Sequence, residues 1–161
     1  MRTRITLFFV IFFLGFLIFQ LSFCGKKKIY SDFAGINEAS WNTSDTLNFD
    51  FNIQDELIKQ TCNISFFGKI NQKYQYANLF LYVDLFIDDN LISRDTLHCI
   101  LYDKFGNLLQ RNMGNTVLFR VSYMDTINLY TNKNYKFRII HGMRNVNLNG
   151  IETVGFKIKK N

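Results

Sequence analysis

The stretch Leu47-Asn48-Phe49-Asp50-Phe51-Asn52-Ile53 decides the fold class of this chain. Apolar and polar residues alternate along it without a break. Because successive side chains of a β-strand point to opposite faces, this pattern predicts a strand with one buried and one solvated face. Residues 62–66 repeat the same period, with Cys62, Ile64 and Phe66 on the predicted inner face.

Similar short segments follow along the rest of the chain. We expect further strands at residues 79–87, 96–101, 117–123, 126–130, 135–140 and 154–158. The uniformly apolar run 79–87 is typical of a central strand covered on both faces. Turn residues such as Asp88-Asp89-Asn90, and Asp103 with Gly106, separate these segments. Since no persuasive helical period appears after residue 24, the sequence predicts an all-β, antiparallel β-sandwich or jelly-roll-like fold, as one domain over residues 29–161.

The N-terminus has a different character and reads as an export signal over residues 1–23. Arg2 and Arg4 supply a basic start, and residues 5–19 are almost purely apolar. This layout predicts a secretory signal helix. The apolar run has about 15 residues, fewer than the roughly 20 that cross a bilayer as a helix. A retained signal anchor is the alternative.

Cys24 stands at the end of this segment. Leu21-Ser22-Phe23-Cys24 resembles the lipobox of bacterial lipoprotein signals, in which the cysteine is lipidated and becomes the mature N-terminus. Phe23 departs from that pattern, because a small residue is usual there. We predict lipid attachment at Cys24, followed by a short tether over residues 24–28. Lys26, Lys27 and Lys28 either favour anionic head groups or form a plain solvated tether.

Charge gives little support to a nucleic-acid partner. Arg2 and Arg4 belong to the predicted export signal and are left out of the count. The rest of the chain has 17 Lys and Arg against 13 Asp and Glu, a net charge of +4. A nucleic-acid-binding domain gathers such charge into a patch or motif. Here the dense basic runs are confined to residues 26–28 and 157–160, so we expect no nucleic-acid partner.

The remaining cysteines are Cys62 and Cys99, both on predicted inward faces. Exported proteins retain disulfides, so these two residues could form one. Two separate buried thiols are the alternative, because cysteine is often fully buried. Their spacing does not match a zinc site.

No catalytic set, metal site or cofactor motif is recognisable. We expect His98 to point away from the core and His141 to share a face with Tyr135, Phe137 and Ile139. A hydrolase would need one of these histidines to contact a carboxylate or a nucleophile. The adjacent Asp88 and Asp89 are typical of a polar turn rather than of an acid/base pair. A ligand- or carbohydrate-binding envelope lipoprotein is the alternative function, with Trp41 as part of a solvent-facing aromatic platform.

Several segments, taken in order, resemble one known family. They are Tyr30, Asp32-Phe33, Trp41, Asp45–Phe51, Tyr76–Val83, Asp95-Thr96-Leu97, Leu101–Gly106, His141-Gly142-Met143-Arg144, Gly150-Ile151 and Val154–Lys159. Across nearly the whole mature chain, this pattern resembles the gliding motility lipoprotein GldH family of the Bacteroidetes.

The resemblance implies a non-enzymatic lipoprotein of the outer membrane, acting with gliding machinery that is linked to the type IX secretion system. It carries over one functional residue, the lipid-bearing Cys24. Gly142 stands where alanine is more usual, a change that we expect to matter little. Met143 and Arg144 are candidates for a surface that contacts an envelope partner. Since residues 25–27 lack an acidic export signal, we expect the domain to face the periplasm.

Overall fold

A computed structural model of the chain describes residues 28–53 and 59–161. The predicted signal helix over residues 1–23 and the predicted lipid site at Cys24 lie outside these residues. Within them, the backbone forms eleven β-strands and one short 3-10 turn, η1 (Asn37–Ala39). In this part of the chain, no helix has the length and apolar character needed to cross a membrane. The prediction of an all-β fold is confirmed.

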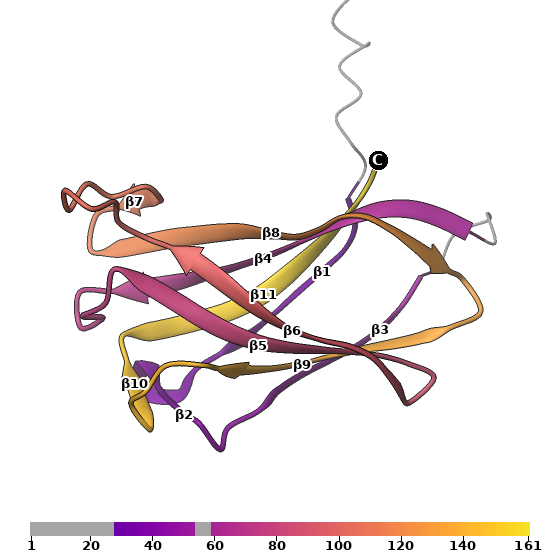
Figure 1. Cartoon of the computed structure of the whole chain (residues 1–161), viewed down its shortest axis with the longest axis horizontal. Coiled ribbons are helices and arrows are strands. Elements are labelled where there is room, and N and C mark those ends of the chain that lie inside the picture. The colour runs from indigo at the N-terminus through magenta and orange to yellow at the C-terminus, as the bar shows by residue number, and fades with distance from the viewer. Residues whose placement is uncertain (1–27, 54–58) are drawn as a thin grey trace, which may run out of the picture.

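The strands form two antiparallel sheets stacked as the layers of a sandwich (Figure 1). The first sheet has the order β1 (Lys28–Gly35), β11 (Ile151–Lys160), β4 (Lys59–Asn71), β8 (Thr116–Tyr130) and β7 (Arg111–Met113). The second has the order β3 (Leu47–Asn52), β9 (Asn134–His141), β5 (Asn78–Ile87) and β6 (Asn90–Ile100). A two-stranded ribbon of β2 (Ser40–Asn42) and β10 (Asn147–Asn149) lies at the end of the sandwich far from the C-terminus.

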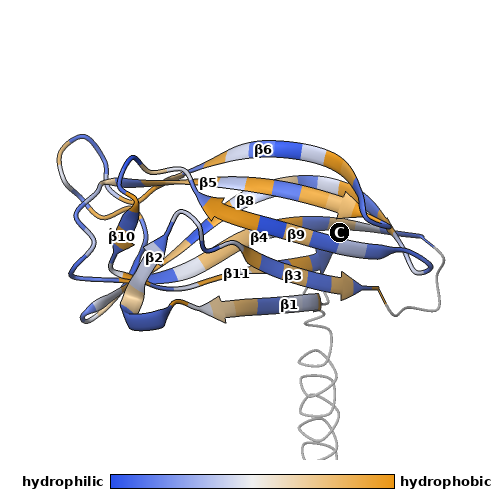
Figure 2. Cartoon of the chain, turned by 90° about the horizontal axis from the view of Figure 1, so that it is seen from below, coloured by the Kyte–Doolittle hydropathy of each residue, from blue (hydrophilic) through white to orange (hydrophobic). Residues whose placement is uncertain are grey.

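The core lies between the sheets because the apolar side chains of each strand point to one side. In β3, Phe49 and Phe51 are buried while the polar residues that flank them are exposed, as the alternation predicts. Figure 2 shows apolar and polar residues alternating along several strands. The Phe156 ring of β11 lies at the centre, with its centroid 5.1 Å from that of Phe51 and 4.9 Å from that of Phe137. Each such pair contributes about 0.5–1.5 kcal/mol beyond its buried area.

Strand β5 lies in the middle of its sheet, between β9 and β6, as predicted. The expectation that both of its faces are covered is wrong. Its inner face is fully buried at Leu81 and Val83, but its outer face carries Tyr82, which is 48% exposed, and the charged Asp84. Cross-strand partners from β6 and β9, rather than a third layer, shield parts of this outer face.

Strand β8 is one continuous element, where the sequence predicts two. Its pairing with β4 shifts register between Cys62 and Ser65 on β4, opposite residues 122–127. Such an irregularity adds a residue to one strand and bends it. Strand β8 therefore continues through the point where its alternation of polar and apolar residues is interrupted.

Both turns predicted from Asp and Gly are present. Asp88 and Asp89 join β5 to β6 with φ of 46° and 64°, the left-handed backbone that a tight type I′ hairpin requires. The Asp103 carboxylate accepts the backbone N–H groups of Phe105 and Asn107, both at 2.8 Å, which closes the second turn.

Candidate functional site

The predicted lipid site lies just before the described domain. Strand β1 begins at Lys28, four residues after Cys24 along the chain, and pairs with β11 as the edge of the first sheet. The anchor at Cys24 stays a prediction, but the domain that it would hold begins within a few residues of it.

Cys62 and Cys99 are separate buried thiols and do not form a disulfide. Cys62 lies on β4, eight residues before Ile70, whereas Cys99 of β6 lies close to Tyr74, beyond the other end of β4. Eight residues of strand span about 26 Å, and the Cα atoms of a disulfide usually lie within about 7 Å of each other. Burial raises the pKa of the Cys99 thiol to about 12, so this group is a neutral part of the core.

Trp41 lies inside the domain, and the prediction of a solvent-facing aromatic platform around it is wrong. Its side chain is 0% exposed, and its indole N–H donates to the Asp45 carbonyl at 2.7 Å. The pairing of Trp41 with the buried Leu148 in the β2–β10 ribbon turns the indole inward, where its ring centroid lies 5.3 Å from that of His141. An enclosed indole offers no face to a sugar ring.

The two histidines lie in different surroundings. His141 ends β9 on the inner face, as predicted, and burial lowers the pKa of its imidazole, which is therefore neutral at pH 7. His98 is exposed on β6, pointing away from Cys99 as predicted; its ring stacks on Phe80 at 4.3 Å and its Nε2 lies 3.1 Å from the Asn78 amide nitrogen. Neither ring is hydrogen-bonded to a carboxylate or nucleophile among the described residues. This arrangement removes the support for a histidine-based hydrolase.

Met143 and Arg144 lie on the loop that joins β9 to β10. Met143 is partly buried against the core, and its Sδ accepts the backbone N–H of Phe80 at 3.4 Å. The neighbouring Arg144 is exposed. The methionine therefore fixes the loop to the sheet, and the arginine extends into solvent.

Half-exposed side chains surround this loop on the outer face of the second sheet. Tyr82 of β5 is 48% exposed and Ile100 of β6 is 49% exposed. The stacked rings of Phe80 and His98 join the same two strands. A Cβ added at Gly142 would lie 3.1 Å from the Tyr82 ring, so the glycine lets that ring rest against the loop. We name this region, made of Tyr82, His98, Ile100, Met143 and Arg144, the β9-loop surface.

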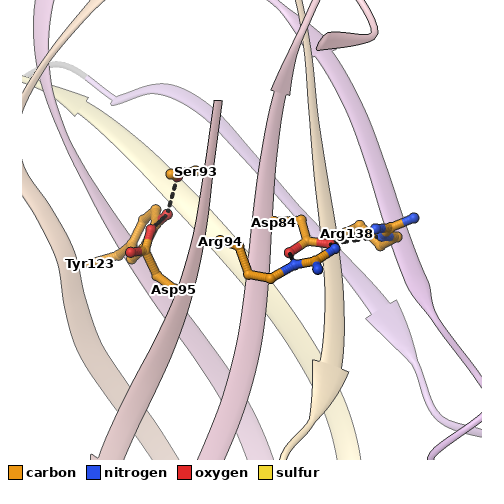
Figure 3. A network of polar contacts seen from close by, with 6 residues as sticks. All are labelled: Asp84, Ser93, Arg94, Asp95, Tyr123 and Arg138. Atoms are coloured by element: carbon orange, nitrogen blue, oxygen red, sulfur yellow. Dashed lines mark hydrogen bonds and ion pairs between the residues drawn. The ribbon is translucent and has the colours of Figure 1, made fainter. Parts of the chain in front are cut away.

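A charged network lies on the same face of the sheet, two residues further along β5. Asp84 accepts hydrogen bonds from Arg94 Nε on β6, at 2.8 Å, and from Arg138 Nη2 on β9, at 2.6 Å (Figure 3). The Arg94 guanidinium, assisted by Arg138, holds the pKa of the Asp84 carboxyl below its usual range, against the opposing effect of burial. The carboxylate is 10% exposed and ties three strands together.

A second contact in Figure 3 joins the two sheets. The Tyr123 hydroxyl of β8 donates to the Asp95 carboxylate of β6 at 2.6 Å, and it also lies 3.2 Å from the Ser93 hydroxyl. Burial, and then the hydrogen bond to Asp95, raise the pKa of Tyr123, so the phenol keeps its proton. Sequence reasoning missed both networks because each depends on which strands are neighbours.

The described residues contain no group of three or more His, Cys, Asp or Glu side chains that could hold a metal ion. On the second sheet, the outward-facing features described above are the β9-loop surface and the charged network beside it.

Comparison with known proteins gives a consistent family assignment. The model of the family described as GldH lipoprotein matches residues 28–158. The chain is 27% identical to a gliding motility lipoprotein GldH homolog of Christiangramia forsetii, over 94% of this chain and 96% of that protein. It is 23% identical to the gliding motility lipoprotein GldH of Flavobacterium johnsoniae, over 85% of this chain and 87% of that protein.

Solved structures resemble the chain only weakly. A dimeric latent PorU from Porphyromonas gingivalis matches 86% of this chain with 13% of its own length, at 8% identity and a TM-score of 0.35. The NLP core of Drosophila matches 82% of this chain with 98% of its own, at 7% identity and a TM-score of 0.32. Likeness at this level carries no functional argument.

Proposed function

Because the chain belongs to the GldH lipoprotein family, we propose that it is a membrane-anchored, non-catalytic component of the envelope machinery for gliding motility, linked to type IX secretion. The observation that carries this proposal is the extent of the family match, which covers residues 28–158 and so nearly all of the described domain. Both named relatives are gliding motility lipoproteins or homologs of one, and each matches over more than four fifths of its length.

The proposed anchor is the lipidated Cys24. A lipoprotein cysteine carries two or three acyl chains, and two chains suffice for stable attachment where one is marginal. Attachment raises the concentration of the domain near partners in the same membrane, so assembly needs less affinity from each contact. We place the protein at the outer membrane, with the domain in the periplasm.

Metabolic labelling with radioactive palmitate tests the anchor. The native chain should carry the label and sediment with membranes, whereas Cys24→Ser should lose both properties and fail to restore gliding in a deletion strain. The matched control is Cys99→Ala, which removes a buried thiol and should keep the label. Label that survives Cys24→Ser would contradict the anchor.

Protease added to intact cells tests the periplasmic location of the domain. The protease should leave the domain uncut, and cleavage of the domain would contradict a periplasmic location.

The proposed partner surface is the β9-loop surface. Met143 holds its loop rigidly enough to present Arg144, and the half-exposed Tyr82 and Ile100 add apolar area beside that charge. Interface centres are enriched in Arg, Met and aromatic side chains and depleted in Lys and Glu. This composition supports a protein partner from the same envelope machinery.

A further inference from the structure

A cavity of about 640 Å³ lies on the outer face of the first sheet, which no strand among the described residues covers. Strand register explains the hollow. Phe33, Gly155, Phe67 and Arg120 stand opposite one another on β1, β11, β4 and β8, and all face outward. Because Gly155 has no side chain, β1 lies close to β11, and a Cβ at Gly155 would lie 2.6 Å from the Phe33 Cβ. The hollow lies beside this row, where Phe33 and Phe67 face the segment before β7.

The neighbouring row supplies the floor and part of the charge. Thr153, Lys69, Leu118 and Arg111 stand opposite one another on β11, β4, β8 and β7. The cavity therefore has apolar walls and a cationic rim.

The wall of the cavity on the β7 side is held in place by Gln110. Its amide nitrogen donates to the Ile100 carbonyl at 2.9 Å, and its amide oxygen accepts the Arg120 backbone N–H at 3.2 Å. The Leu109 N–H donates to the Leu101 carbonyl at 2.8 Å. These bonds bind the segment before β7 to both sheets, so the hollow is preformed.

Three cations and no carboxylate line this cavity. Lys69, Arg111 and Arg120 are all exposed, and none forms an ion pair with any carboxylate in residues 28–53 or 59–161. By contrast, Arg94, Arg138 and Lys136 on the second sheet all have acidic partners. Because these three cations of the cavity have no acidic partner among the described residues, we expect the cavity to favour an anionic ligand.

Apolar side chains are exposed around the same cavity. Phe33 is 64% exposed and Leu109 is 57% exposed, and both line the cavity. Exposed aromatic and aliphatic groups among unpaired cations are typical of surfaces that lie at a membrane interface.

We infer that this cavity binds the phosphate-bearing head group of an anionic lipid, with Arg111 and Arg120 on the phosphate and the exposed apolar side chains in the interface. Arginine binds phosphate through paired hydrogen bonds, and the volume lies within the roughly 300–1,000 Å³ of ligand sites. The inference rests on the proposed lipid anchor, because β1 begins four residues after Cys24 and an extended tether of that length reaches at most about 14 Å. The anchor thus keeps the edge of the first sheet near the bilayer.

Amide hydrogen exchange of the lipidated full chain in vesicles tests the inference. Exchange at residues 109–120 should be slower in vesicles with 30% phosphatidylglycerol than in pure phosphatidylcholine, and the difference should vanish in high salt. The double variant Arg111→Gln/Arg120→Gln should weaken this lipid-dependent protection about 30-fold, since each cation near an anionic surface contributes about 1 kcal/mol. The control Lys59→Gln/Lys73→Gln removes the same charge from exposed sites outside the cavity and should keep the protection.

Three results would overturn the lipid assignment: equal protection in both vesicle types, protection that survives Arg111→Gln/Arg120→Gln, and the same protection from inorganic phosphate without anionic lipid. Failure of the anchor is distinguishable from these. If Cys24 carries no acyl chain, the chain does not enter the vesicles and carries no palmitate label, whereas a failed cavity leaves a labelled, vesicle-bound chain without the lipid-dependent difference.

Discussion

At the scale of single residues, the arginines on the outer face of the second sheet differ in whether a carboxylate engages them. Arg94 and Arg138 are engaged by Asp84, whereas Arg144 extends from a loop that Met143 fixes to the sheet. An engaged arginine stabilises the domain, and an unengaged one is available to a partner. Removing Arg144 should therefore affect assembly and leave folding unchanged.

We predict that Arg144→Ala impairs gliding and loses envelope partners in a pull-down of the lipidated protein from its native membrane. Its thermal unfolding should stay within about 0.5 kcal/mol of the native protein, as for most exposed sites. The control Lys59→Ala removes an exposed cation at the far end of β4 and should keep both gliding and partners. Loss of the fold in Arg144→Ala, or full gliding, would contradict a role at the partner surface.

At the scale of secondary-structure elements, neighbouring strands are held by contacts that join their outer faces as well as by their backbones. Asp84 on β5 links β6 and β9 through one nearly buried carboxylate. Tyr123 of β8 reaches Asp95 of β6 and closes the side of the sandwich where the two sheets meet. These contacts compensate for the absence of a third layer over β5 in the described domain.

We predict that Asp84→Asn lowers the free energy of unfolding at pH 7 by about 2 kcal/mol, because hydrogen bonds to charged groups contribute about 1.5–3 kcal/mol. The pKa of Asp84 is lowered in the folded state, so its stabilisation is complete above its unfolded pKa of about 3.9 and is lost as the pH falls through the folded value. Urea unfolding of both proteins at pH 7, pH 3 and pH 2 measures this. A difference between variant and native protein that stays constant down to pH 2 would contradict the assignment.

At the scale of the whole molecule, one aromatic cluster connects the two sheets. Phe156 of the first sheet contacts Phe49, Phe51 and Phe137 of the second. These residues lie up to 107 positions apart in the chain, from 49 to 156, so the core forms only when both ends of the domain have come together.

We predict that Phe156→Ala destabilises the domain by about 3–5 kcal/mol, because it removes a buried ring and leaves a cavity at the centre of the cluster. Denaturant unfolding followed by tryptophan fluorescence reports this loss, since Trp41 is buried in the same core. The control Phe105→Ala removes a ring that is 77% exposed and should change the stability by no more than about 0.5 kcal/mol. Equal losses in the two variants would argue against the cluster as the centre of the core.

Local pattern determined the all-β class, the inner faces of β3 and β4, the turns at Asp88-Asp89 and Asp103–Gly106, and the family, because side-chain alternation and turn chemistry act over a few residues. Local pattern did not predict β1, because residues Lys28–Gly35 lack a clear alternation. It also predicted two strands in place of β8, divided where the pairing of β8 with β4 shifts register.

Tertiary structure alone decided the rest. Trp41 is enclosed because β2 pairs with a strand more than 100 residues later, and Cys62 and Cys99 are separated because they lie toward opposite ends of the sandwich. Asp84 meets its arginines, and Phe67 and Arg120 come together at the cavity, only through strand register. Register depends on pairing between distant segments, and no short stretch of sequence contains that information.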